Sequence, residues 1–271
     1  MSLDDLLNQA PRYPERIVCL TEETTEILYT IGAGDRVVGV SGFTKRPAEA
    51  RDKPTISTFL DANYDEIDKL KPDLVLGFSD LQADIARDLA KRGVPIYLFN
   101  QRSVAEILQT VRVVGALVGA APEAEALAQQ LEANLRRHAE AARELPRRPR
   151  IFLEEWHEPL IAGIRWTSEL TEIAGGDDVC RETRDQQGAR GRIYEPGEIA
   201  RRAPDVIIAS WCGRKVEPDK IRAREGWSDV PAVRNDRIFE IDSTILLQPG
   251  PAALTDGIDE LARIVRLTVT E

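Results

Sequence analysis

The chain has 271 residues, of which 42% are hydrophobic and 30% are charged, a composition typical of a globular protein and not of a disordered one. With 36 Lys and Arg against 46 Asp and Glu, the net charge is −10, which disfavours nucleic acid and anionic lipid as partners. No apolar run approaches the ~20 residues that a membrane span requires, so direct membrane insertion is not expected.

Short β-branched runs alternate with helical patterns, which predicts an α/β protein with parallel strands. The predicted strands are Arg16–Leu20, Val37–Val40, Leu74–Gly77, Ile96–Phe99, Ile151–Glu154, Val206–Ala209 and Ile238–Ile241. The predicted helices are Thr24–Ile31, Tyr64–Leu70, Ala83–Arg92, Val104–Val118, Glu123–Leu145, Thr167–Ala174, Pro196–Arg202 and Leu254–Leu267. Ser103 and Glu106 form a capping-box pattern at the start of the Val104 helix.

Two blocks of sequence recur in the same order in both halves of the chain. Arg16–Val40 and Arg150–Val179 each begin with Arg-Ile and an apolar strand, and each continues to a helix followed by Gly-Asp. Asp65–Ser79 and Gly197–Trp211 each give Glu-Ile, then Pro-Asp, an apolar strand and Ser. This internal similarity predicts two lobes of the same architecture.

The segment between the lobes is rich in Ala, Leu, Glu and Arg and stops at Pro146. It predicts a helix of about 30 Å, either on the surface of one lobe or as a rigid connection between the two. We therefore expect an N-terminal α/β lobe over residues 1–120, a linker helix over 121–146 and a C-terminal α/β lobe over 147–271.

These features together resemble a known family of transport proteins. They are the block RIVCLTEETTEILYTIGAGDRVVGV, the elements LKPDLVLG and APDVII, the long linker helix, the block ELTEIAGGDDV and the C-terminal QPGPAALTDGIDELARIV. In order and spacing they resemble the helical-backbone class of substrate-binding proteins of ABC importers, in its cobalamin and iron–siderophore branch. The resemblance implies two Rossmann-like lobes joined by one long helix. It also implies a monomer without a resident cofactor or metal, which holds a small molecule in an interlobe cleft and delivers it to an ABC permease.

The candidate ligand-binding residues follow the predicted strands, because open α/β sheets bind ligands at the carboxyl ends of their strands. They are Glu22, Glu23, Phe43, Phe59, Ser79, Gln82, Arg102, Glu155, Trp156, Arg165, Trp166, Trp211 and Gln248. Large aromatic side chains in loops usually line a pocket or an interface, which favours a large planar ligand such as a corrin or a porphyrin.

The charged members of this set refine the expectation. Arg102 and Arg165 can pair with a carboxylate or phosphate of the ligand. Glu22 and Glu23, with Glu154 and Glu155, add negative charge, which argues against a strongly anionic ligand such as a ferric catecholate. The leading ligand is a cobalamin-like corrinoid, followed by an iron–siderophore complex or haem.

A site made only of metal ligands is not supported, because the chain has only two histidines. His138 lies in the predicted linker helix. His157 follows a strand, where it is either an ordinary loop residue or an axial ligand of cobalt or haem iron.

Two glutamates stand at equivalent places in the repeat. Glu66 precedes Pro72, and Glu198 precedes Pro204, by the same interval. The family resemblance implies that one surface glutamate per lobe pairs with arginines of the permease. We therefore expect Glu66 and Glu198 to be the docking residues, with ordinary solvated helix residues as the alternative.

No catalytic motif is present. The sequence lacks a GxSxG elbow, a Walker-type loop and a GxGxxG after a strand, and the glycines of Ile31–Asp35 are predicted to end a helix. We expect no enzyme, and a hydrolase built around the glutamates is the weaker alternative.

The sequence is compatible with two compartments. Met1–Asp5 has neither a basic nor an apolar segment, so no signal peptide is predicted. Either an export signal was removed, or the chain is a cytoplasmic corrinoid-handling or sensing protein on the same fold.

Overall fold

The computed structural model describes Leu3 and residues 12–270, while residues 1–2, 4–11 and 271 are not described. Met1–Asp5, where no signal peptide is predicted, therefore lies outside the described residues apart from Leu3. The described chain forms two compact units. Unit 1 holds the residues up to Gln101 together with Leu108–Gln129, and unit 2 holds Arg102–Ile107 together with the residues from Gln130 onward. The expected lobe boundaries were residues 120 and 147, whereas the two units divide the long helix after Gln129.

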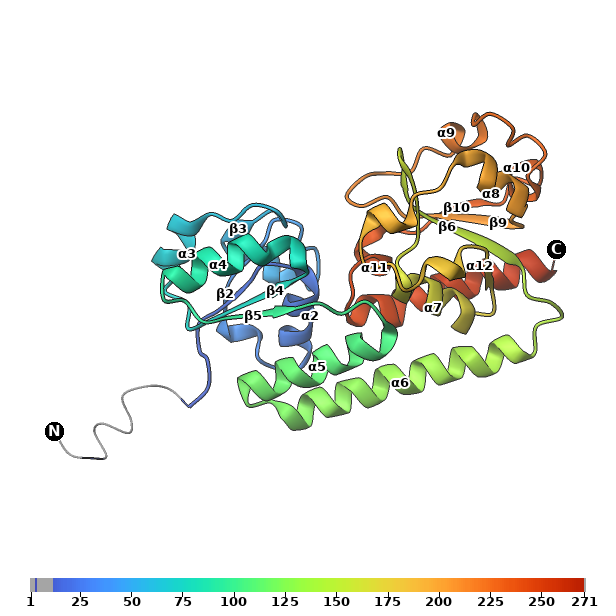
Figure 1. The fold of residues 1–271 in the computed structure, drawn as a ribbon. Coiled ribbons are helices and arrows are strands. Elements are labelled where there is room, and N and C mark those ends of the chain that lie inside the picture. The colour runs from blue at the N-terminus through green and yellow to red at the C-terminus, as the bar shows by residue number, and fades with distance from the viewer. Residues whose placement is uncertain (1–2, 4–11, 271) are drawn as a thin grey trace. The chain divides into compact units, whose positions relative to one another are not determined.

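Unit 1 contains a parallel sheet with the strand order β3–β2–β1–β4–β5 (Figure 1). Its strands are β1 (Ile17–Cys19), β2 (Val37–Ser41), β3 (Thr55–Ser57), β4 (Leu74–Phe78) and β5 (Ile96–Phe99). Its helices are α2 (Glu22–Thr30), α3 (Tyr64–Leu70) and α4 (Ala83–Lys91), with 3₁₀ turns at Gly34–Arg36, Ala48–Asp52 and Asp80–Gln82. The order reverses on either side of β1, which is the topology that gathers the strand-end loops at one edge.

The core of unit 1 follows from the alternation of side chains along β1. Val18 and Leu20 point to one face, where they pack with Ile67 of α3 and with Ile85 and Leu89 of α4. All five side chains are buried. No polar group is required on this face, and the polar side chains lie at the ends of the strands.

Unit 2 contains a mixed sheet with the strand order β10–β9–β6–β7, and β8 also pairs with β6. Its strands are β6 (Arg150–His157), β7 (Leu160–Ala162), β8 (Asp177–Asp178), β9 (Val206–Ala209) and β10 (Ile238–Glu240). Its helices are α7 (Arg165–Ile173), α8 (Pro196–Arg202), α9 (Pro218–Arg222), α10 (Pro231–Arg234), α11 (Ser243–Leu246) and α12 (Ile258–Thr270). Short helical turns cover Arg181–Thr183, Ala189–Arg192 and Ala253–Gly257.

The hairpin β6–β7 is the main difference between the two sheets. The predicted strand Ile151–Glu154 continues to His157 and returns as β7, which pairs antiparallel with it. The parallel partner β8 is therefore limited to Arg150 and Ile151. The sequence did not reveal this hairpin, because Trp156 and His157 resemble loop residues and β7 has only three residues.

Two helices connect the sheets along the chain, α5 (Val104–Val118) and α6 (Ala121–Arg143). The capping box of α5 is confirmed: Ser103 Oγ accepts from the Glu106 N–H at 3.2 Å, and the Glu106 carboxylate accepts from the Ser103 N–H at 2.9 Å. Within unit 1, Gly115 lets α5 approach the start of α6, since a Cβ there would lie 2.2 Å from the Ala124 Cβ. The α/β fold class and the long connecting helix agree with the expectation.

The sequence repeat has the same structural role in both units. The Arg16 side chain donates to the Leu70 carbonyl at the end of α3, and the Arg150 side chain donates to the Arg202 carbonyl at the end of α8. Asp73 accepts from the Arg16 N–H at 2.9 Å, and Asp205 accepts from the Arg150 N–H at 2.9 Å. The Arg-Ile and Pro-Asp pairs therefore tie each first strand to the helix and strand beside it.

Candidate functional site

The carboxyl edge of the unit 1 sheet carries the predicted ligand-binding residues of this unit. Because all its strands are parallel, the loops after β1, β2, β3 and β4 meet at one edge. Glu22 and Glu23 begin α2 after β1, Phe43 follows β2, Phe59 follows β3, and Ser79 and Gln82 follow β4. The topology therefore brings these six residues to the same edge, as the sequence predicts.

Exposed apolar side chains concentrate at this edge. Phe43 is 48% exposed, Leu60 is 60% exposed and Leu81 is 61% exposed, and they follow β2, β3 and β4 respectively. Phe59 beside Leu60 is half-buried. We call Phe43, Phe59 and Leu81 the apolar edge, since exposed apolar groups gathered at a strand edge are typical of a ligand-binding surface.

Ser79 and Gln82 form hydrogen bonds with the backbone of the loops at this edge. Gln82 is fully buried, and its side chain accepts from the Phe78 N–H at 3.0 Å and donates to the Phe59 carbonyl at 2.8 Å. Ser79 is also buried and accepts from the Leu81 N–H at 3.3 Å. Both residues therefore hold the β3 and β4 loops in place, which gives them a positioning role.

Glu23 does not supply the negative charge expected from the sequence. Its side chain is buried at the start of α2, and it accepts a hydrogen bond from the Thr21 hydroxyl at 2.7 Å. Burial raises the pKa of Glu23 to about 8, with a further contribution from the charge of Glu22. Its carboxyl group is thus mainly protonated at neutral pH, while Glu22 remains partly exposed beside it.

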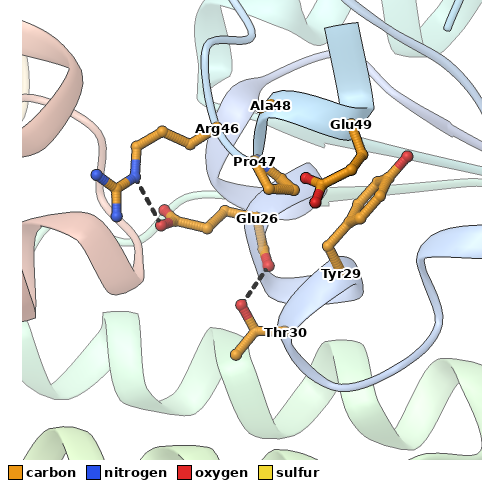
Figure 2. A pocket seen from close by; sticks show the side chains of 7 residues that line it. All are labelled: Glu26, Tyr29, Thr30, Arg46, Pro47, Ala48 and Glu49. Carbon is orange, nitrogen blue, oxygen red and sulfur yellow. Dashed lines mark hydrogen bonds and ion pairs between the residues drawn. The ribbon is translucent and has the colours of Figure 1, made fainter. Parts of the chain in front are cut away.

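A pocket of about 520 Å³ lies in unit 1 between α2 and the segment after the β2 loop. Figure 2 shows Glu26, Tyr29 and Thr30 on the α2 side and Arg46–Glu49 on the other. Arg46 donates to Glu26 at 3.1 Å, and the Thr30 hydroxyl donates to the Glu26 carbonyl at 2.8 Å. The charges of this pocket are partly paired within it.

In unit 2 the two glutamates at the end of β6 are neutralised by arginines. Glu154 is fully buried and binds Arg224 through two hydrogen bonds of 2.6 and 2.8 Å. Glu155 binds Arg192 at 2.6 and 3.1 Å. The negative charge expected from these two carboxylates is therefore balanced within unit 2, because each is paired with a guanidinium.

The tryptophans of unit 2 differ in exposure. Trp166 is buried in the first turn of α7 and donates to the Leu246 carbonyl at 3.0 Å, and Trp211 is buried and donates to Glu154 at 3.0 Å. Both indoles have packing roles, and neither lies in a loop open to a ligand. Trp156 is half-buried in β6. Of the three, it alone keeps accessible ring surface for a ligand.

His157 continues this aromatic group. Its ring stacks on Trp211 with 4.4 Å between ring centroids, and its Nδ1 is buried with no hydrogen-bond partner among the described residues. Arg214, which no sequence pattern marked, lies over Trp156 at 5.5 Å from the ring centroid. Its position in the turn after β9 could have indicated it, since that turn also follows a strand end.

The remaining predicted residues of unit 2 are held by neighbours. Arg165 is the first residue of α7 and binds Glu169 at 2.7 Å. Arg102 is buried, and its backbone N–H donates to Glu106 at 2.7 Å. Gln248 is half-buried, and its carbonyl accepts from the Gly250 N–H at 2.8 Å. Nothing in these contacts tests their predicted role toward a ligand.

Glu66 and Glu198 occupy equivalent places, as the repeat predicts. Each is the third residue of a seven-residue helix, α3 or α8, and each helix ends on a residue with a positive φ, Lys71 or Ala203. Glu66 pairs with the exposed Lys69 at 3.1 Å. Glu198 pairs with Arg202 at 2.6 Å, and Arg202 also binds Glu182.

The described residues offer neither a metal site nor a membrane-spanning helix. They contain no group of three or more His, Cys, Asp or Glu side chains placed to hold a metal ion. None of their helices is long and apolar enough to cross a membrane. His138, far along α6, instead binds Asp259 of α12 at 2.7 Å within unit 2.

Two α/β units with repeated first strands and a long connecting helix define a class of bilobal solute-binding protein. Residues 17–245 match the family model described as periplasmic binding protein, and the chain belongs to this family. Members of this family are solute-binding proteins of ABC transporters and not enzymes, which excludes the hydrolase alternative.

Similar proteins place the chain within this family. It is 27% identical over 274 residues to an uncharacterized ABC transporter substrate-binding lipoprotein of Bacillus subtilis, covering 98% of this chain and 85% of that one. It is 25% identical over 258 residues to the vitamin B12-binding protein of Vibrio parahaemolyticus, covering 93% and 90%. The structure of a periplasmic heme-binding protein from Roseiflexus sp. RS-1 is similar with a TM-score of 0.78 at 25% identity, covering 93% and 99%. The chain is thus similar over most of its length to substrate-binding proteins of ABC transporters within the periplasmic binding protein family.

Proposed function

We propose that this protein binds a cobalamin-like corrinoid and delivers it to an ABC permease. The observation that carries the proposal is the apolar edge of unit 1, where Phe43 and Leu81 expose about half or more of their surface beside Phe59. Exposed apolar groups gain free energy when a ligand removes them from water, at roughly 25 cal/mol per Å². A corrin ring offers the large apolar surface that such an edge requires.

Unit 2 supports a ligand without a strong net charge. Glu154 and Glu155 are paired with Arg224 and Arg192, so the end of β6 is close to neutral. Trp156 offers half-buried aromatic surface next to His157. The similarity to a vitamin B12-binding protein over 93% of the chain agrees with this choice.

Haem is the second candidate, and Arg214 favours it. The guanidinium of Arg214 lies over Trp156, and Arg214 and Lys215 are both exposed without an ion pair in the described part of the chain. Haem carries two carboxylates that such cations can bind. The similarity to a heme-binding protein agrees with this alternative.

Titration of the protein with cyanocobalamin and, separately, with haemin tests the proposal. We expect cyanocobalamin to bind one to one with micromolar or tighter affinity by calorimetry, with quenching of the tryptophans, all four of which belong to unit 2. Phe43→Ser should weaken binding about tenfold, since it removes ~1.4 kcal/mol of apolar contact. Tyr97→Ser, at an exposed aromatic residue within β5, is the matched control. Binding of haemin alone would move the assignment to haem, and no binding of either would refute it.

Docking to the permease is the second part of the proposal, and Glu66 and Glu198 would supply it. Reversing both charges, as Glu66→Lys and Glu198→Lys, should abolish uptake while the affinity for the ligand stays unchanged. Glu140→Lys, at an exposed glutamate of α6, is the control. Uptake that survives the double reversal would remove both residues from the docking surface.

A further inference from the structure

Each unit exposes one large aliphatic side chain on the segment that leads into its glutamate-bearing helix. Leu60 is 60% exposed four residues before α3, and Ile193 is 45% exposed three residues before α8. Single exposed apolar residues are common and need no explanation. The recurrence at nearly the same place in both repeats is what singles these two out.

Leu60 is held in its exposed position by the backbone around it. The Thr58 N–H donates to the Asp61 carbonyl at 2.9 Å, and Ser57 and Ala62 form an antiparallel bridge. The side chain of the buried Gln82 donates to the Phe59 carbonyl at 2.8 Å. The turn that carries Leu60 is therefore fixed before any partner arrives, which lowers the entropy cost of binding.

Ile193 is fixed in a similar way at the rim of a pocket. It forms an antiparallel bridge with Ile161 of β7, and the Tyr194 N–H donates to the Leu160 carbonyl at 2.9 Å. The pocket has a volume of about 530 Å³ and is built only from unit 2. Apolar parts of its wall come from Pro159, Leu160 and Pro196 beside Ile193. It can admit a side chain of a partner protein next to Ile193.

Acidic side chains accompany both aliphatic residues. Asp61 and Asp65 are exposed beside Leu60, and Glu158 and Glu195 are exposed on the wall of the Ile193 pocket. None of these four carboxylates makes an ion pair with any described residue. The wall of the Ile193 pocket also holds Lys220 and Arg224, whose charges are paired with Glu217 and Glu154. We call Leu60, Asp61 and Asp65 patch 1, and Ile193, Glu158 and Glu195 patch 2.

The negative charge of patch 1 and patch 2 determines which kind of partner can bind to them. A second copy of this chain has a net charge of −10 and would bring further acidic groups to acidic patches. An anionic lipid surface is disfavoured for the same reason. A segment in which basic side chains flank an apolar one complements both the charge and the exposed aliphatic group.

We propose that patch 1 and patch 2 each seat such a basic and apolar segment of the ABC permease. This inference rests on the proposed docking function and extends it, because it adds an apolar anchor to each glutamate contact. The apolar anchors supply affinity, and the surrounding carboxylates attract and orient the basic segment.

The test measures binding of the ligand-free protein to the purified ABC permease that it serves in the uptake assay, held in nanodiscs. Leu60→Ser and Ile193→Ser should each weaken binding about fivefold to tenfold, and the double variant by more than twentyfold. Asp65→Asn and Glu195→Gln should make the affinity less dependent on salt. Ile193→Ser, Asp65→Asn and Glu195→Gln should bind cyanocobalamin as the unchanged protein does, whereas Leu60 lies next to the apolar edge and its variant is judged on docking alone.

Two matched controls make the result specific. Leu267→Ser changes an aliphatic residue on α12 that is 37% exposed, and it should leave docking unchanged. Leu81→Ser, in the apolar edge, should weaken cyanocobalamin binding but not docking. A change below twofold in the Leu60 and Ile193 double variant, while the Glu66 and Glu198 reversal still weakens docking, would overturn this inference alone. If the unchanged protein fails to bind the permease, the docking function fails as well.

Discussion

The leading strands of the two units are alike at three aligned positions and differ at the next one. Ile17–Cys19 and Ile151–Leu153 are apolar and buried in both. The next residue is Leu20 in unit 1 and Glu154 in unit 2, and both are fully buried. Unit 1 buries a leucine in an apolar face, whereas unit 2 buries a carboxylate between Arg224 and the Trp211 indole.

The start of the following helix shows the opposite exchange. In the aligned helices α2 and α7, Glu23 corresponds to Trp166, and both are buried. Unit 1 here buries a carboxyl group whose pKa is raised to about 8, whereas unit 2 buries an indole. The same backbone framework therefore accepts polar or apolar groups at a strand end, provided that a partner or a proton neutralises the charge.

The largest effect is expected at Glu154. Glu154→Ala should lower the free energy of unfolding by about 3–5 kcal/mol, because it leaves the largely buried Arg224 without its counter-charge. Urea unfolding followed by tryptophan fluorescence measures it, since every tryptophan lies in unit 2. Glu154→Leu combined with Arg224→Leu should cost less, because both charges leave together. An equal or larger cost in the double variant would show that the loss in Glu154→Ala does not come from leaving Arg224 unpaired.

The buried Glu23 should make unit 1 less stable as the pH rises. Its pKa is about 8 in the folded state against a usual value near 4.5, so between these values the folded state holds a proton that the unfolded state has lost. The folded state is therefore fully favoured below pH ~4.5 and loses that advantage up to pH ~8, a change on the order of a few kcal/mol.

Glu23→Gln removes this titration and should flatten the pH dependence between pH 5 and 8. Urea unfolding of unit 1, followed by hydrogen exchange of the α2 amides, measures the effect. Trp166→Phe, at the equivalent position of unit 2, carries no titratable group and serves as the control. A Gln variant with the same pH slope as the unchanged protein would contradict the raised pKa.

The smallest effect on stability is expected at the two aspartates that have the same structural role in both units. Asp73→Ala and Asp205→Ala each remove a carboxylate that accepts the backbone N–H at the start of β1 or β6. Each should cost about 1–3 kcal/mol, because the N–H loses its partner. Hydrogen exchange at Arg16 and Arg150 reports the two sites separately. A cost confined to one unit would show that the repeated Pro-Asp motif has lost its structural role in the other.

The sequence was a good guide to regular elements with strong local signals. Tyr64–Leu70, Val104–Val118 and Pro196–Arg202 were predicted with the bounds that the structure has. Ser103 and Glu106 marked the start of α5 because a capping box depends on residues close in sequence. The glycines after α2 also end this helix as predicted, with Gly32 at positive φ, and Gly175 has the same conformation after α7.

The candidate site was predicted less completely, because its chemistry depends on partners distant in sequence. The carboxyl edge of unit 1 followed from the parallel strands, so Phe43 and Phe59 were placed correctly at this edge. Glu154 pairs with Arg224, which lies 70 positions further along the chain, and no local sequence pattern predicts this pairing. For the same reason Trp166 and Trp211 resembled loop residues, although both pack inside unit 2.

The sequence by itself determined the α/β class, the internal repeat and the elements whose signals are local, since periodicity and caps act within a few residues. Only the tertiary structure decided which charges are neutral and which aromatic rings are accessible. Burial and ion pairing arise when distant segments meet, and they set both the protonation of Glu23 and the pairing of Glu154 and Glu155. Exposure of Leu60 and Ile193 is likewise a property of the folded units, because an aliphatic residue in the sequence is by default expected to be buried.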